Sequence, residues 1–265
     1  MVVVGAGFIS YFATQIGIPF WIAFFVGIIL TGILGFILER TFLRPMVGEP
    51  VFSVAVLTIG IDILLRVVLD NWIGINPKYM GDPFPSFGNF GSLSLGGLTI
   101  KYLEVTALVV SLVLIFILSI FFKKSKYGVA MRATSLDQEA ALAQGINVGR
   151  VFGLVWFIAG LLAAFAGFFI TGGFNTLTNS SFISALRALP AVVIGGLDSI
   201  TGAVIGSLII GLTQAYVGYY QFDIESAYNI TLGNGFSIVA PYLIMFIILI
   251  IKPHGLFGTE EVERV

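Results

Sequence analysis

Four polar side chains recur at every fourth position inside an otherwise apolar run: Thr58, Asp62, Arg66 and Asp70. At 3.6 residues per turn, they share one face of a helix, and we call them the charged stripe. A charge at the centre of a membrane helix costs about 2.5–3.5 kcal/mol on insertion scales, so this face must contact protein or water. Two interpretations stay open: a lining for a polar pathway, or an ion pair that neutralises itself at a helix–helix contact.

A second unusual place is the apolar run 182–196, which contains Arg187 and Pro190. Proline removes a backbone donor and breaks the regularity of a helix. The combination predicts a broken or re-entrant helix, which a membrane tolerates only where protein buries it or where it lines a cavity. A kinked ordinary span is the alternative. We therefore count Arg187 and Pro190 with the charged stripe as candidate pathway-lining residues.

The third place is a polar segment that links the fourth and fifth apolar runs. Ser135 is suited to an N-cap, and Gln138 completes a capping box three residues later. Asp137 and Glu139 fall in the first turn, where the helix dipole favours acids, and Gly145 suits the C-terminal stop. These residues predict a helix of two to three turns, parallel to the membrane. It serves either to dock a partner or merely to connect two spans.

Composition indicates which elements must position these residues. Of the 265 residues, 58% are hydrophobic and 10% are charged, whereas a soluble domain has about 25% charged residues. A bilayer core needs about 20 apolar residues per helix. We therefore predict an all-α, polytopic transmembrane bundle that forms a single transmembrane domain over residues 1–265. Its eight apolar segments are 2–14, 18–38, 51–73, 105–122, 151–171, 182–196, 200–220 and 236–251.

Basic residues predict the orientation, because cytoplasmic loops hold Lys and Arg preferentially. If the segments alternate, the loop at about 123–150 and both chain ends are cytoplasmic, and the loop at about 74–104 is extracytoplasmic. That arrangement puts nine of the 13 basic residues inside: Arg40, Arg44, Lys123, Lys124, Lys126, Arg132, Arg150, Lys252 and Arg264.

The start of the chain is unusual, because it opens within an apolar run and has no charged region before it. It does not have the pattern of a signal peptide. We expect an N-terminal piece to be missing, and a first span that is simply short is the alternative.

Several classes of function find no support in the residue types. There is no cysteine, and the single histidine, His254, follows the last apolar run, so thiolate and histidine-rich metal sites are excluded. No P-loop pattern occurs, so we expect no ATP hydrolysis and no cofactor on this chain. The near-neutral charge gives no sign of nucleic-acid binding. No nucleophile–base pair lies in the spans, so an intramembrane enzyme lacks support.

Small residues four apart predict places where helices approach closely. The pairs are Ala163 with Gly167 and Gly202 with Gly206. Such small-xxx-small pairs are typical of helix contacts in membranes, and no ligand need be invoked for them.

A resemblance becomes specific in the polar segment. Glu139-Ala140-Ala141 followed by Gly145 resembles the EAA loop of permeases in bacterial and archaeal ABC importers. Four segments are similar in sequence to the branched-chain amino-acid permease family: 128–150, which surrounds this loop, 189–197, 202–206 and 252–258. That family usually has one more apolar segment upstream, and it more often has Gln where this chain has His254.

The resemblance implies a division of labour. This chain would be half of a membrane channel in the cell membrane of a prokaryote, with a related or identical permease as the other half. Two cytoplasmic subunits would bind ATP and Mg²⁺, and an extracytoplasmic binding protein would deliver the solute. The residues implied in coupling to the ATPase are Arg132, Ser135, Asp137, Glu139, Ala140, Ala141, Gly145 and Asn147.

The substrate stays open. Branched-chain amino acids are the first expectation, and urea, amides or other amino acids are alternatives within the family. A secondary transporter driven by ion gradients is a more distant alternative, which the charged stripe motivates.

Overall fold

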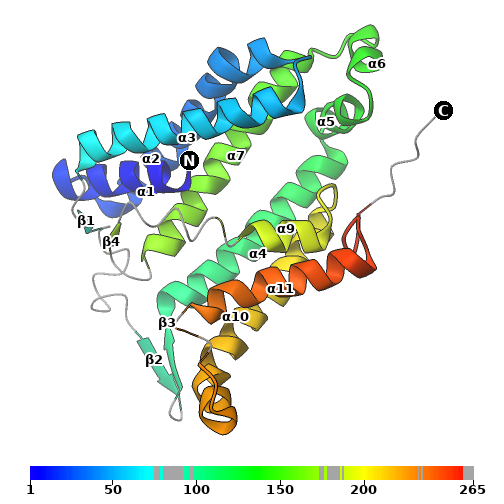
Figure 1. The fold of residues 1–265 in the computed structure, drawn as a ribbon. Helices are drawn as coiled ribbons and strands as arrows, with labels where there is room; N and C mark the ends of the chain where they lie inside the picture. Colours follow the sequence, from blue (N-terminus) through cyan, green and yellow to red (C-terminus); the bar gives the residue numbers. More distant parts are fainter. Residues whose placement is uncertain are drawn as a thin grey trace. The chain divides into compact units, whose positions relative to one another are not determined.

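The computed structural model describes residues 1–74, 78–79, 92–95, 98–172, 176–177, 186, 188–231, 233 and 235–258. The chain divides into two compact units, Met1–Phe182 and Ile183–Val265, and each is described by itself (Figure 1).

The first unit is mainly helical. Pro19 and Pro50 stand immediately before α2 and α3, and extended backbone at Lys101 and Ser125 marks the starts of α4 and α5. In chain order its helices are α1 (Val2–Ser10), η1 (Tyr11–Gln15), α2 (Phe20–Leu38), η2 (Glu39–Leu43), η3 (Arg44–Met46), α3 (Val51–Ile73), α4 (Tyr102–Lys124), α5 (Lys126–Leu136), α6 (Gln138–Ala143) and α7 (Val148–Gly172).

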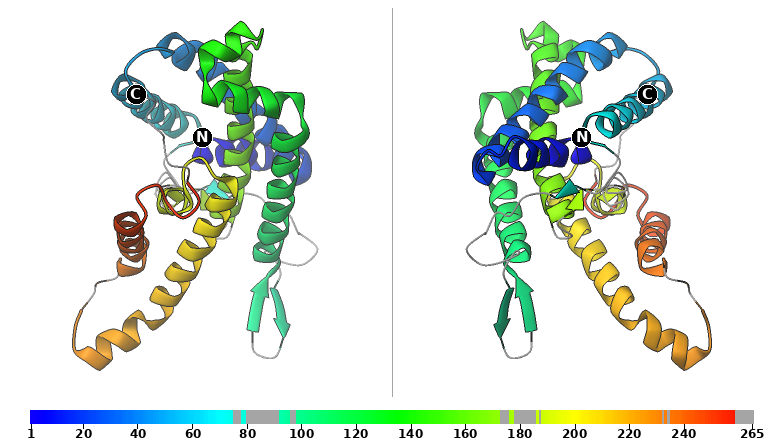
Figure 2. Two further views of the ribbon diagram at one scale, coloured as in Figure 1. Left: turned by 90° about the vertical axis from the view of Figure 1, so that its right-hand side faces the viewer. Right: turned by 90° about the vertical axis from the view of Figure 1, so that its left-hand side faces the viewer.

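Two short antiparallel strand pairs accompany the helices. β1 (Lys78–Tyr79) pairs with β4 (Thr176–Leu177), and β2 (Ser92–Leu95) forms a hairpin with β3 (Leu98–Lys101), which leads directly into α4. Figure 2 shows this hairpin at the start of α4. An all-α prediction omits these strands, because β1, β2 and β3 lie in the polar loop before α4 and β4 is a strand of two residues after α7, where hydropathy gives no signal for a strand.

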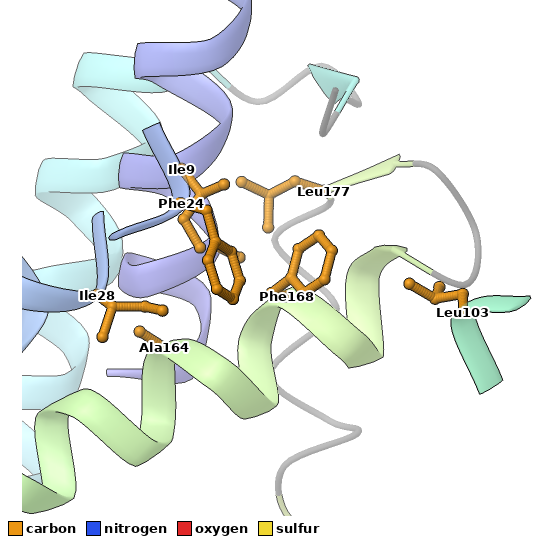
Figure 3. Close-up of a cluster of buried hydrophobic side chains, with 8 residues drawn as sticks. Ile9, Phe24, Ile28, Leu103, Ala164, Phe168 and Leu177 are labelled. Atoms are coloured by element: carbon orange, nitrogen blue, oxygen red, sulfur yellow. The ribbon is translucent and has the colours of Figure 1, made fainter. Parts of the chain in front are cut away.

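The core of the first unit lies between α1, α2 and α7. Phe24 and Phe168 meet edge to face, with ring centroids 5.0 Å apart. Ile9, Ile28 and Ala164 pack around them (Figure 3). Aromatic pairs in this geometry stabilise a core beyond the apolar area that they bury.

Small residues let these helices approach to backbone contact. A Cβ at Gly167 of α7 would lie 2.1 Å from the Val2 carbonyl oxygen, and one at Gly160 would lie 2.5 Å from the Thr31 carbonyl oxygen. Ala163 is half-buried, and its neighbour Ala164 is fully buried and makes the contact with Gly5. The close face of α7 therefore includes Ala164 as well as Gly167.

The second unit packs α9 (Ala188–Gly195), α10 (Ile200–Tyr228) and α11 (Phe236–Ile251) around a small apolar core. Gly202 and Gly206 of α10 face the backbone of α9: a Cβ at Gly202 would lie 2.0 Å from the Gly195 carbonyl oxygen, and one at Gly206 would lie 2.0 Å from that of Ala191. Any side chain larger than hydrogen would push α10 away from α9.

The residues after α11 turn back onto α9. The amides of Leu256 and Phe257 donate to the carbonyl oxygens of Ile194 and Gly195, at 2.8 and 3.1 Å. These carbonyls belong to the last turn of α9, which has no intrahelical donors for them. The stretch 252–258, which carries part of the family resemblance, thus caps the C-terminal end of α9.

Five helices of the described residues are long and apolar enough to cross a membrane, and two shorter apolar helices accompany them. The predicted bounds of α3 and α11 agree with the structure. α10 is eight residues longer than predicted, because its end at Asn229 (φ 51°) lies in a polar, tyrosine-rich stretch. The predicted count of eight spans and the cytoplasmic position of the termini stay predictions.

Candidate functional site

The structure contains the predicted helix of the polar segment, but this helix is shorter than predicted and is capped differently. Asp137 is the N-cap of α6, and its Oδ1 accepts hydrogen bonds from the amides of Glu139 and Ala140, both at 2.9 Å. The prediction of Ser135 as N-cap is wrong, because α5 continues through Ser135, whose hydroxyl donates to the Arg132 carbonyl oxygen. The extended backbone at Asp137 separates the two helices.

Gly145 ends α6, as its position in the sequence predicts. Its backbone is left-handed (φ 80°), and its amide donates to the Leu142 carbonyl oxygen at 2.9 Å. The next amide, of Ile146, donates to the Ala141 carbonyl oxygen at 3.0 Å. This pair of bonds is the Schellman motif, in which a glycine satisfies the free carbonyls of a helix end. Caps at both ends hold a helix of six residues that would otherwise be too short to persist.

The surface of α6 carries exposed polar side chains and one exposed leucine, and a second exposed leucine lies just before it. Ala141 is buried against the unit, whereas Glu139 and Ala140 are exposed. Leu142 is 58% exposed, and Leu136, at the end of α5, is 89% exposed. Both lie outside the helices that could span a membrane. Apolar side chains left uncovered beside water are typical of a binding surface.

The segment is anchored to α7 and α4. Ser125 caps α5 by accepting the Gly128 amide at 2.9 Å, and Asn147 accepts the Arg150 amide at 3.0 Å in the first turn of α7. Gly128 lies against the backbone of Phe121 and Phe122, where a Cβ would come within 2.5 Å of carbonyl oxygens. α5 and α6 lie beside the first turns of α7 (Figure 1).

An ion pair that the sequence analysis missed lies at the same end of the unit. Glu39 is 1% exposed, and Arg44 binds both of its carboxylate oxygens at 3.0 and 3.1 Å. Arg44 also donates to the Gly149 carbonyl oxygen of α7 at 2.6 Å. An acid five residues before an arginine, at the end of an apolar run, is the sequence signal for this pair.

A cavity of about 480 Å³ lies beside the ion pair. It is bounded by the connection from η2 to α3, by Phe152 and Trp156 of α7, by Gln138 of α6 and by Thr58 of α3. The capped helix and the first residue of the charged stripe therefore border one space.

The charged stripe occupies the less exposed face of α3. Thr58, Asp62, Arg66 and Asp70 are all half-buried, whereas the apolar side chains between them, such as Ile59 and Ile63, are exposed. Arg66 binds the carboxylate of Asp62 one turn earlier. Thr58 donates to the Ala55 carbonyl oxygen at 2.8 Å. The structure thus contains the ion pair, and whether the stripe also lines a pathway stays a prediction.

The remaining pathway candidates lie in the second unit. Arg187 lies outside the described residues. Pro190 is fully buried and belongs to α9. Whether this stretch is a broken helix or a kinked span, and whether it lines a pathway, stays a prediction.

Comparison with known proteins identifies the family. A family model described as "Branched-chain amino acid transport system / permease component" matches residues 1–251. The chain belongs to this permease family. Together with the five apolar helices, this makes it a multi-pass membrane protein. Permeases of this family are non-catalytic components of ABC transporters.

Three curated permeases illustrate the similarity. The high-affinity branched-chain amino acid permease BraD of Pseudomonas aeruginosa is 28% identical over 92% of this chain and 76% of its own length. LivH of Escherichia coli is 30% identical over 91% and 75%. The galactose/methyl galactoside import permease MglC of Haemophilus influenzae is 30% identical over 58% and 52%. No solved structure matches the chain.

Proposed function

We propose that this chain forms half of the transmembrane pathway of an ATP-driven importer of branched-chain amino acids. The observation that carries the proposal is the doubly capped α6, whose exposed Glu139-Ala140 and Leu142 lie between two membrane helices of a chain in this permease family. A rigid, exposed helix can transmit a push from a partner, whereas a flexible connector cannot.

Two cytoplasmic ATPase subunits dock on α6 in this proposal, and these subunits bind the ATP and Mg²⁺. A second permease completes the channel, and an extracytoplasmic binding protein delivers the solute. We propose branched-chain amino acids as the substrate, because the relatives that match about nine-tenths of this chain are named branched-chain amino acid permeases. The sugar permease matches a smaller share and supports the permease role alone.

The contacts around α6 offer a route for coupling. Movement of α6 reaches the start of α7, because only the four residues from Gln144 to Asn147 separate the two helices. From there the Gly149 carbonyl connects through Arg44 to Glu39 and the end of α2. The cavity beside this ion pair reaches Thr58 of α3. A shift of α6 is therefore placed to change the environment of the charged stripe.

Docking is tested by co-purification of the full chain with its ATPase partner. Leu142→Asp puts a charge on the exposed side chain of α6, and we expect it to abolish retention of the ATPase while the permease still inserts. Val129→Asp on α5 is the matched control, because Val129 is 51% exposed, close to the 58% of Leu142. Equal retention by both variants and wild type would rule out docking through α6.

A further inference from the structure

A cavity of about 820 Å³ lies at the Lys- and Arg-rich end of the first unit, and the coupling role leaves it unused. It is separate from the cavity beside Thr58, although Arg44 borders both. Its polar lining comes from four elements or connections: Arg40 and Arg44 follow α2, Tyr127 belongs to α5, Asn147 precedes α7, and Arg150 is in its first turn.

Two of the three arginines are not neutralised. Arg44 is engaged by Glu39. No carboxylate of the described residues lies within ion-pair distance of Arg40 or Arg150, and both arginines are exposed. Arg150 also lies in the first turn of α7, where the helix dipole adds to the positive potential. The mouth of the cavity thus carries an uncompensated double positive charge, which attracts an anion.

The other wall is apolar and runs into the membrane spans. It consists of Phe36 of α2, Phe121 of α4, and Leu154 and Phe157 of α7. At 1.5 Å rise per residue, Leu154 and Phe157 lie about 9 and 14 Å along α7 from its start. A cavity that begins among arginines and continues along apolar helix walls has the polarity profile of a phospholipid, with a charged head group above acyl chains.

We infer that this cavity binds an anionic diacyl phospholipid, with its phosphate between Arg40 and Arg150 and its acyl chains along Phe36, Phe121 and Leu154. Basic pockets between membrane helices at the cytoplasmic surface are suited to such head groups. Tyr127, with an exposed ring at the same level, suits the interfacial layer. The ends of α2 and α4 and the start of α7 set the depth of the site at the membrane surface.

The test is a lipid-retention measurement on the purified full chain by native mass spectrometry, with phosphatidylglycerol and phosphatidylcholine as probes. We expect wild type to retain phosphatidylglycerol over phosphatidylcholine. Arg40→Gln and Arg150→Gln should each weaken phosphatidylglycerol binding about fivefold, since each basic residue near a membrane surface contributes about that factor. Lys124→Gln, an exposed lysine outside the cavity lining, is the control for charge loss alone and should change binding little.

Three outcomes would overturn the inference. Equal retention of the two lipids would remove the anionic preference. An equal loss in Lys124→Gln and in Arg40→Gln would assign the effect to general surface charge. Displacement of phosphatidylglycerol by inorganic phosphate would mean a small-anion site without a role for the apolar wall. Lipid retention is measured without transport, so failure of the proposed importer function would leave this result unaffected.

Discussion

The guanidinium group of Arg44 donates two hydrogen bonds, of 3.0 and 3.1 Å, to the buried carboxylate of Glu39. Gly149 and Gly153 of α7 make room for this pair. A Cβ at Gly149 would lie 3.2 Å from the guanidinium carbon, and one at Gly153 would lie 3.3 Å from a carboxylate oxygen and 2.6 Å from the Phe36 ring. The pair joins the extension of α2 to the start of α7.

Removal of one partner should therefore destabilise the protein. Arg44→Ala leaves the Glu39 carboxylate buried without its cation, which we expect to cost about 2–3 kcal/mol, at the low end of buried pairs because Arg44 is partly exposed. The midpoint of thermal unfolding in detergent measures the effect. Lys123→Ala removes an exposed positive charge at the same end and should leave that midpoint near wild type. An unchanged midpoint in Arg44→Ala would contradict the structural role of the pair.

The left-handed turn that ends α6 makes a second prediction. Gly145→Leu should cost about 1–2 kcal/mol locally, because a side chain disfavours this conformation, and ATP-driven uptake should fall while membrane insertion is normal. Gly17→Leu is the matched control, since Gly17 has φ 76° against 80° for Gly145 and both have open space around them. Glu139→Lys on the same helix should give the same loss of coupling. Full uptake in Gly145→Leu, or an equal loss in Gly17→Leu, would count against the coupling role.

The charged stripe offers a choice between two interpretations. Arg66→Ala removes the cation that binds Asp62, and we expect a loss of about 2–3 kcal/mol in stability together with reduced uptake. The double variant Asp62→Asn/Arg66→Gln removes both charges and should recover the stability. If uptake recovers too, the pair is structural. If uptake stays low, the stripe lines the pathway. Wild-type stability and uptake in Arg66→Ala would contradict both interpretations.

Close packing in the second unit predicts opposite effects of one substitution at two glycines of α10. Gly206→Ala puts a methyl group on the Ala191 carbonyl, and we expect destabilisation by about 1–3 kcal/mol. Gly211→Ala meets no atom within 4 Å, and it should be neutral or stabilise by up to about 1 kcal/mol through helix propensity. The measurement is the midpoint of thermal unfolding of each variant. A Gly206→Ala protein as stable as the Gly211→Ala protein would contradict the close contact between α9 and α10.

Hydropathy and turn chemistry were sufficient to locate most of the fold. The apolar runs gave α3 and α11 their bounds, and Gly145 marked the end of α6, because these signals are local in the chain. The sequence predicts the N-cap of α6 two residues too early. Ser135 and Asp137 are both good caps, and the choice depends on how far α5 continues, which tertiary contacts with α7 decide.

Features that depend on distant residues were not predictable. The spacing of Glu39 and Arg44 is a local signal for their ion pair, but only the fold brings that pair to Gly149 of α7. The lipid cavity likewise needs Arg40 and Arg150, which are 110 positions apart in the chain, to border the same space. The role of residues 252–258 in capping α9 follows from packing within the second unit.

Uptake of leucine into proteoliposomes tests the central claim most directly. The full chain is reconstituted with its partner permease, the ATPase subunits and the extracytoplasmic binding protein, and radiolabelled leucine is supplied on the binding-protein side. The account predicts accumulation only when ATP is present on the ATPase side and its loss in Leu142→Asp. Accumulation without ATP under an ion gradient alone would contradict it and would favour a secondary transporter.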